Sequence, residues 1–217
     1  MTVRLAVFDC DGTLVDGQAS ICIAMETAFA GAGLPTPDRH DIRRIVGLSL
    51  PQAVRLLAPD ADEARRHHAV DAYKHAFRTS RLDGTLEEPL FDGIADLLGL
   101  LAGRGWTLGV ATGKSDRGLA GCLATHGIAE HFVTLQTADR HPSKPDPAML
   151  EAALAEAGAQ ADNSVMIGDT TFDMDMARAA GVRAIGVAWG YHTAQELREA
   201  GAEHVARTPA ELGELLS

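Results

Sequence analysis

The sequence predicts an α/β protein in which a parallel sheet is covered by helices on both faces, with a small all-helical unit inserted after the first strand. Two observations predict this fold. From residue 85 onward, short apolar runs alternate with longer helical patterns, which is typical of right-handed βαβ units. Between residues 17 and 84, no run has the character of a strand. We therefore expect a core domain of residues 1–16 and 85–217, and a helical cap domain of residues 17–84.

Short apolar segments give the expected strands. They are residues 4–8 (RLAVF), 106–112 (WTLGVAT), 131–137 (HFVTLQT), 164–169 (SVMIGD) and 183–189 (RAIGVAW). Near-continuous apolar runs of this kind suit strands that are covered on both faces.

The sequence indicates where the helices between these strands begin. Asp92 is a candidate N-cap for the segment GIADLLGLLAG, and Ser115 is one for DRGLAGCLATHG, because short polar side chains accept hydrogen bonds from the first turn of a helix. The segment DPAMLEAALAEAG has proline in its first turn and ends at Gly158, and TPAELGELL has a similar opening.

Residues 17–84 contain three helical patterns, ASICIAMETAFAGAG, SLPQAVRLL and DADEARRHHAVDAYKHAF. Their apolar residues recur at the spacing of one helix face. We expect Gly17 and residues 81–88 to serve as hinges between this unit and the core.

Composition excludes several classes of partner. The chain carries 19 Lys and Arg against 30 Asp and Glu, a net charge of −11, which disfavours nucleic acid and anionic membrane surfaces. No apolar run approaches the ~20 residues of a membrane-spanning helix, and acidic residues come too early for a signal peptide. Three scattered cysteines without a CxxC pair indicate reduced thiols. We expect a soluble, cytoplasmic protein, and the sequence leaves its oligomeric state open.

Polar residues gather at the predicted strand ends. Because the carboxyl ends of parallel strands share one edge of a sheet, ligands bind there. The residues that follow or end these strands, or stand in the loop HPSKPDP, are Asp9, Asp11, Thr112, Gly113, Lys144, Asp169 and Asp173.

So many carboxylates need a positive partner, since like charges at close range repel each other. Mg²⁺ prefers oxygen ligands and is held by one or two carboxylates plus a substrate phosphate. We expect Asp9, Asp169 and the main-chain carbonyl of Asp11 to bind the metal. Lys144 then neutralises the remaining phosphate charge and Thr112 donates a hydrogen bond, while Gly113 allows close approach of the backbone. Asp9 can attack in line as a nucleophile, and Asp11 can act as acid and base.

Four segments, DCDGTLVD, ATGKS, HPSKPDP and GDTTFDMDMA, occur in this order. Together they resemble the four motifs of the haloacid dehalogenase superfamily, in its phosphatase branch. The resemblance implies a Rossmann-like core with a cap. It also implies Asp9 as nucleophile, Asp11 as acid and base, Thr112 and Lys144 as phosphate binders, Asp169 as metal ligand and Asp173 as support. Dehalogenases of this superfamily lack the second aspartate, so the presence of Asp11 argues against that activity.

Two further segments carry a resemblance to the same superfamily. RRIVGLSL (43–50) resembles the cap loop that reaches into the active site, so Arg43 and Arg44 are candidates for gripping a substrate carboxylate or a second phosphate. GVAWGYH (186–192) is similar to the tail of phosphoglycolate phosphatases. The implied substrate is a small phosphorylated metabolite such as phosphoglycolate.

Histidines offer a second, weaker metal hypothesis. His67, Asp71 and His75 follow one stripe of a helix, a spacing seen in metal sites. Their charged neighbours favour an exposed helix face instead. His192 leaves both a site role and a structural role open.

The motifs leave other functions open. A phosphotransferase or mutase acting on a sugar phosphate, or a pyrophosphatase, would use the same residues. A phospho-receiver module also combines acidic residues, Thr, Lys and Mg²⁺, but there the acidic pair and the phosphorylated Asp stand on different strands.

Overall fold

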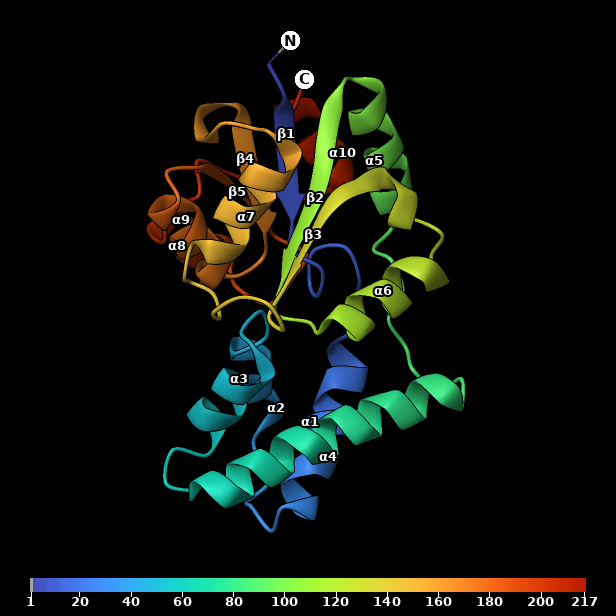
Figure 1. Cartoon of the computed structure of the whole chain (residues 1–217), viewed down its shortest axis with the longest axis vertical. Helices are drawn as coiled ribbons and strands as arrows, with labels where there is room; N and C mark the ends of the chain where they lie inside the picture. Colours follow the sequence, from blue (N-terminus) through green and yellow to red (C-terminus); the bar gives the residue numbers. More distant parts are fainter. Residues whose placement is uncertain (1) are drawn as a thin grey trace.

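The computed structural model describes residues 2–217, and over this range six parallel strands form one sheet. In order across the sheet they are β3 (Phe132–Thr137), β2 (Trp106–Thr112), β1 (Arg4–Phe8), β4 (Ser164–Gly168), β5 (Arg183–Val187) and β6 (His204–Ala206). The chain order reverses direction at β1, which lies between β2 and β4. Their carboxyl ends all point toward the helical unit (Figure 1).

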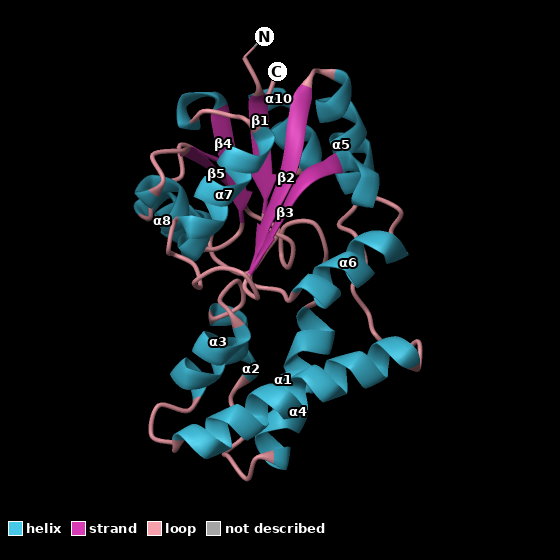
Figure 2. Ribbon diagram, viewed as in Figure 1, coloured by secondary structure: helices cyan, strands magenta, loops and turns pink. Residues whose placement is uncertain are grey.

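Helices cover both faces of the sheet (Figure 2). On one face lie α5 (Ile94–Gly103), α6 (Asp116–Thr125) and α10 (Pro209–Leu215), and on the other lie α7 (Ala148–Ala157), α8 (Thr171–Ala179) and α9 (Ala194–Glu199). The side chains of β1 show why: Ala6 and Phe8 join the first apolar cluster, and Leu5 and Val7 join the second. Successive residues of a strand point to opposite faces, so a continuous apolar run serves two cores. The predicted α/β fold is confirmed.

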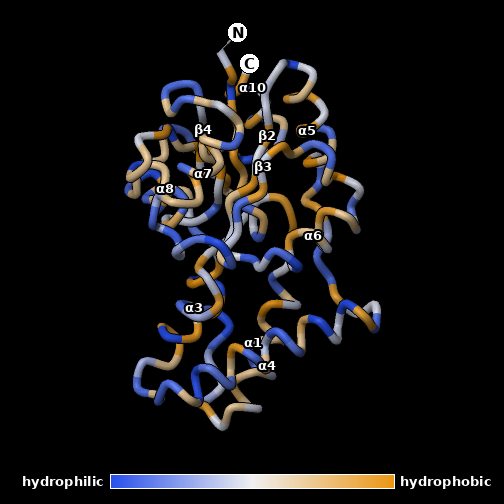
Figure 3. The backbone as a smooth tube through the Cα atoms, in the orientation of Figure 1, coloured by the Kyte–Doolittle hydropathy of each residue, from blue (hydrophilic) through white to orange (hydrophobic). Residues whose placement is uncertain are grey.

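Four helices form a separate unit with its own apolar core, beneath the carboxyl ends of the strands (Figure 1). They are α1 (Gln18–Gly31), α2 (Arg39–Arg44), α3 (Leu50–Leu57) and α4 (Glu63–Leu82). Phe29, Ile42 and Val54 are fully buried in a cluster of their own. Hydrophilic and hydrophobic stretches alternate along α4 in Figure 3, as expected for a helix with one exposed face.

The structure corrects two details of the predicted elements. Asp92 is not the N-cap of α5: Gly93 occupies that position with a φ of 87°, so the chain turns one residue later than expected. The strand β6 has three residues, of which His204 is exposed, and so short an edge strand leaves no apolar run in the sequence. Ser115 does cap α6, accepting a hydrogen bond of 3.1 Å from the Gly118 N–H.

No helix within residues 2–217 combines the length and the apolar character that crossing a bilayer demands.

Candidate active site

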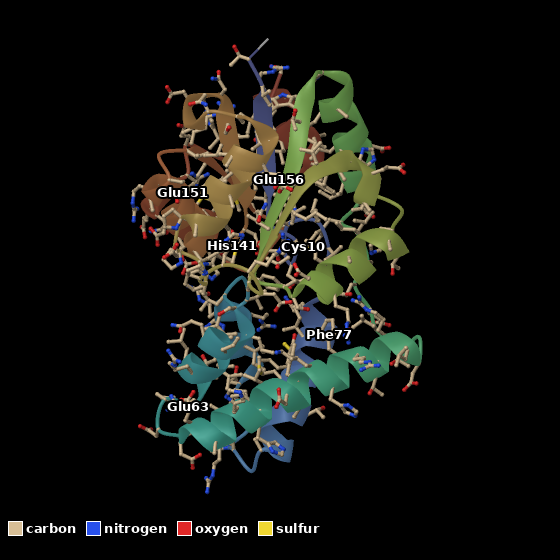
Figure 4. All side chains as sticks on the ribbon, viewed as in Figure 1. Cys10, Glu63, Phe77, His141, Glu151 and Glu156 are labelled. Atoms are coloured by element: carbon tan, nitrogen blue, oxygen red, sulfur yellow. The ribbon has the colours of Figure 1, made fainter. Side chains whose placement is uncertain are left out.

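The ends of β1, β2 and β4 meet at the edge of the sheet that faces the helical unit. Asp9 follows β1, Thr112 ends β2 and Asp169 follows β4. All three side chains are buried. In Figure 4, Cys10 marks this edge, and Phe77 lies across from it on α4. The topology therefore gathers residues that are about 160 positions apart in the sequence.

Lys144 lies at the centre of this edge, and its side chain is fully buried. Its Nζ is 2.9 Å from Asp9 Oδ1 and 2.6 Å from Asp173 Oδ1. Although burial lowers the pKa of this ammonium group, the carboxylates of Asp173 and Asp9 raise it more, so that the net pKa lies above the usual range. The two carboxylates therefore favour the charged form of Lys144.

Asp173 is itself held in place by the start of α8. Its Oδ2 accepts hydrogen bonds from the Thr170 N–H (3.1 Å) and the Thr170 hydroxyl (2.7 Å). This is a capping box, in which a side chain satisfies a free backbone donor at the helix start. The carboxylate of Asp173 thus stabilises the start of α8 and also holds the ammonium group of Lys144.

Asp169 is held by contacts to both of its oxygens. The Thr13 hydroxyl donates to Oδ1 at 2.9 Å, and the Tyr191 N–H donates to Oδ2 at 2.9 Å. A Cβ atom at Gly12 or at Gly190 would collide with this carboxyl group. These two glycines are therefore required for the backbone to approach Asp169 so closely.

Three carboxylates, those of Asp9, Asp169 and Asp173, each offer an oxygen within 4.8 Å of the others. Burial raises the pKa of Asp9, and burial and the neighbouring carboxylates raise the pKa of Asp169. Asp9 Oδ2 is buried and has no hydrogen-bond partner within the described residues. One ammonium group cannot balance three carboxylates, so this oxygen-only donor set fits a hard divalent cation.

Asp11 lies apart from that cluster. Lys114 Nζ is 2.9 Å from Asp11 Oδ1, and the same ammonium group is 2.6 Å from Glu88 Oε1. The carboxylate of Asp11 is thus engaged by a lysine rather than by the three-carboxylate cluster. The sequence-based expectation that its main-chain carbonyl binds a metal stays a prediction.

The phosphate-binding candidates Thr112 and Gly113, at the carboxyl end of β2, line a cavity. Thr112 is 1 % exposed, and its hydroxyl oxygen accepts a hydrogen bond of 3.2 Å from the Lys114 N–H. Gly113 lies directly under a loop of the helical unit: a Cβ atom there would be 2.5 Å from the Leu48 carbonyl oxygen and 2.6 Å from that of Gly47. Only a hydrogen atom fits at this position.

The cavity has a volume of about 480 Å³ and lies between the core and the helical unit. Asp9, Asp11, Thr112 and Gly113 line its core side. The opposite wall is apolar and aromatic, with a rim of basic side chains. The wall and rim include Ile21, Met25, Leu50, Tyr73, Phe77, Lys74, Arg78, Arg81 and Arg117.

Arg43 and Arg44 do not line the cavity, and their expected contact with substrate stays a prediction. Arg44 instead makes a two-pronged ion pair with Glu196 of α9, with N–O distances of 2.7 and 3.1 Å. Its carbonyl oxygen is 3.3 Å from His192 Nε2. The sequence could not reveal this, because the partners are about 150 residues away.

His192 has a structural position. Its Nδ1 accepts a hydrogen bond of 3.1 Å from the Thr171 N–H, so that the proton of the neutral ring is on Nε2, facing the Arg44 carbonyl. The alternative metal site on α4 is not formed, because His67, Asp71 and His75 are exposed side chains outside the three-carboxylate cluster.

Sequence reasoning missed Lys114, Glu88 and the basic rim. Lys114 stands in the ATGKS motif, two residues after Thr112, and that position was the available signal. Glu88 and Arg81 lie in a stretch of mixed charge that gives no sign of burial, yet the Glu88 side chain is only 6 % exposed.

This arrangement of strand ends can be compared with known proteins. The family model of haloacid dehalogenase-like hydrolases matches residues 6–187. The chain belongs to this family. Among its relatives, a protein of Dickeya dadantii named "Probable phosphatase IndB" is 38% identical over 213 residues, which cover 96% of this chain and 91% of that protein. The resemblance noted from the motifs is thereby confirmed.

Two other relatives carry different names. A Pseudomonas aeruginosa protein named 5'-nucleotidase is 34% identical, covering 97% of this chain and 94% of its own. A phosphoglycolate phosphatase of Pseudomonas syringae pv. tomato is 30% identical, covering 90% and 73%. Among solved structures, a "predicted phosphatase" from Clostridium acetobutylicum has a TM-score of 0.89 at 26% identity, covering 100% of this chain and 99% of its own. The family and the fold are thus shared along almost the whole chain.

Proposed function

We propose that this hydrolase is a Mg²⁺-dependent phosphatase that acts on a small phosphorylated metabolite, such as phosphoglycolate, through a phosphorylated aspartate. The observation that carries the proposal is the environment of Asp9. One of its oxygens is bound by the buried Lys144, and the other is buried without a partner beside Asp169. The names of the phosphatase relatives support a phosphoric monoester hydrolase.

In the proposed reaction, Asp9 attacks phosphorus while the bond between phosphorus and the ester oxygen breaks. Asp11 gives a proton to the departing oxygen, and then takes one from the water that hydrolyses the phosphorylated aspartate. Lys144 neutralises phosphate charge, the Thr112 hydroxyl donates to a phosphate oxygen, and Gly113 keeps the backbone close. Asp173 keeps Lys144 in place.

Magnesium would be held by Asp9 and Asp169, together with the main-chain carbonyl of Asp11. When bound, it supplies positive charge that orients the phosphate and offsets the carboxylates. The orphaned Asp9 Oδ2 and the three-carboxylate cluster support this assignment.

We further propose that residues 17–84 act as a cap over a core of residues 1–16 and 85–217, with hinges at Gly17 and residues 81–88. The separate apolar cluster of the four helices supports this division. The cavity between the two units would then admit substrate when they part and exclude water when they close.

A second candidate is hydrolysis of a nucleotide-sized phosphomonoester. The cavity of about 480 Å³ lies within the ~300–1,000 Å³ range of sites for drug-sized ligands. Its aromatic wall and the relative named 5'-nucleotidase also favour a larger substrate than phosphoglycolate.

The test is a screen of about 50 phosphorylated metabolites for release of inorganic phosphate, with and without Mg²⁺, using wild type and Asp9→Asn. We expect the variant to lose at least the ~10²–10⁴ attributed to one catalytic group. Its fold should persist, because Lys144 keeps Asp173 as a partner.

Each outcome has a definite meaning. Retained activity in Asp9→Asn, or full activity in excess chelator, would contradict the proposal. Isomerised sugar phosphate without phosphate release would instead identify a mutase, and a phosphorylated protein without turnover would identify a receiver. Binding of Mg²⁺ itself is measured by calorimetry on the wild type and Asp169→Asn.

A further inference from the structure

A line of alternating charges runs from the end of α4 to Asp11, separate from the cluster around Lys144. Arg81 is 2.8 Å from Glu88 Oε2, and Lys114 Nζ is 2.6 Å from Glu88 Oε1. Lys114 Nζ is also 2.9 Å from Asp11 Oδ1. The side chains of Lys114 and Glu88 are 7 % and 6 % exposed. Solvent screens such buried pairs little, so each charge constrains the next.

Asp11 depends on this line for its position. Its Oδ1 is buried and makes no aligned hydrogen bond, so that the ion pair with Lys114 is the contact that holds it. A Cβ atom at Gly17 would be 3.0 Å from this oxygen and 3.8 Å from Glu88 Cγ. The start of the helical unit, the return connection and the proposed acid therefore meet within a few ångströms.

Two side chains of α4 fix the other end of the line. The Lys114 ammonium group lies 5.4 Å from the centre of the Phe77 ring, a cation–π contact. Arg81, in the last turn of α4, binds Glu88 and also the Gly118 carbonyl at 3.4 Å. Glu88 lies in the connection that runs from α4 to α5 (Figure 1). The line thus crosses from the helical unit to the core.

We propose that Lys114 is a positioning residue for Asp11, and that Glu88 and Arg81 make this position depend on where α4 lies. The inference rests on the proposed function, because it assumes that Asp11 protonates the departing oxygen. With α4 against the core, Arg81 and Lys114 share Glu88, and Lys114 holds Oδ1 of Asp11. The other oxygen carries the proton that passes to the ester oxygen as the phosphoryl group moves to Asp9.

When α4 moves away, Arg81 and Phe77 leave, and Glu88 then has Lys114 as its sole partner. Lys114 is drawn toward Glu88 and away from Asp11. The acid is therefore in place when the helical unit covers the substrate, and out of place when the cavity is open to bulk solvent. Asp11 would then activate a water held in the closed cavity, so that the phosphorylated aspartate is hydrolysed there and not in the open state.

The experiment compares two substrates that differ in their leaving group. An alkyl phosphate identified in the screen needs a proton on its departing oxygen, whereas p-nitrophenyl phosphate releases a stable anion. The variant Lys114→Met/Glu88→Gln removes one positive and one negative charge, so that the net charge of the line is unchanged while Asp11 loses its ammonium partner. In single-turnover measurements we expect release of the alcohol from the alkyl phosphate to slow by about 10²-fold, the cost of misplacing a catalytic group by ~1 Å. Release of p-nitrophenolate in the first turnover needs no acid and should slow by less than about threefold. Steady-state turnover should fall for both substrates, because water attack on the phosphorylated aspartate also uses Asp11.

Arg81→Met is the second variant, and it keeps the test available if the double variant does not fold, because the Arg81 side chain is 28 % exposed. For Arg81→Met we expect the first-turnover rate on the alkyl phosphate to fall about tenfold, with little change for p-nitrophenyl phosphate. A loss of this size lies between that of a surface contact and that of a catalytic group. Arg81→Lys should recover most of the lost rate. Arg39→Met is the matched control, since Arg39 pairs with Glu26 within the helical unit, away from the cavity.

Equal losses of the first-turnover rate on both substrates, no loss, or failure of Arg81→Lys to recover the first-turnover rate would each overturn the proposal. These outcomes are distinct from failure of the proposed function, in which the wild type would hydrolyse neither substrate.

Discussion

The strand-end site and the contact between the two units are both built from ion pairs, yet they differ in burial. Lys144, Asp9 and Asp173 have side-chain exposures of 0–1 %. In the Arg44–Glu196 pair, which joins α2 to α9, each side chain is about one third exposed. Lys144, Asp9 and Asp173 are thus held together in the interior at the edge of the sheet, while the Arg44–Glu196 pair between the units is one that water can replace.

This difference has an energetic consequence. Breaking a buried pair leaves an uncompensated charge and is strongly destabilising, whereas exposed pairs contribute little. A molecule built in this way could separate its two units without disturbing the contacts among Asp9, Lys144 and Asp173. Three substitutions test the comparison, from the largest expected effect to the smallest.

The largest effect is expected for Lys144→Met. It leaves the buried carboxylates of Asp9 and Asp173 without their ammonium partner, so we expect the free energy of unfolding to fall by about 3–5 kcal/mol. Urea denaturation measures this, and phosphate release should be lost as well. Arg178→Met, at an exposed pair with Asp175, is the control and should change stability by less than about 0.5 kcal/mol. A loss at Lys144 no larger than the control would show that the site is not the rigid part.

A smaller effect is expected at the contact between the units. Arg44→Met should lower the free energy of unfolding by about 0.2–1 kcal/mol, and high salt should reduce the difference. A double-mutant cycle with Glu196→Gln measures the coupling. A salt-independent coupling above about 2 kcal/mol would mean that this pair locks the units together.

The smallest effect concerns pH and is absent near neutrality. Burial, and then the Arg44 guanidinium, lower the pKa of His192 from 6.5, because a second ring proton would face the Thr171 N–H. The unfolded chain therefore binds this proton more readily, and stability should fall as the pH drops below about 6.5. His192→Gln should flatten this part of the stability profile, measured by urea denaturation between pH 7.5 and pH 5. An unchanged slope would exclude His192 as its source.

The same contrast separates what the sequence could predict from what it could not. Asp9, Thr112 and Asp169 end buried strands, and parallel strands necessarily bring such ends together, so their proximity follows from local patterns. Lys144 was recognised by its motif. The assignment of chemical roles to these residues remains a prediction.

Contacts between the units have no comparable local signal. Arg44 was expected to face substrate, but its partner Glu196 is 152 residues away. Glu88 is buried by charges from two other elements, and only the folded chain shows this. The edge strand β6 was missed because it has three residues and begins at the exposed His204.

The seating of the Gly47–Leu48 loop on Gly113 has a consequence for how such enzymes diversify. Because main-chain atoms form this contact on both sides, the contact does not depend on which side chains surround the cavity. Mutations in α1 or α4 can therefore change the lining of the cavity while the Gly47–Leu48 loop keeps its contact with Gly113. The side chains that line the cavity can therefore change in evolution without changing how the Gly47–Leu48 loop contacts the core.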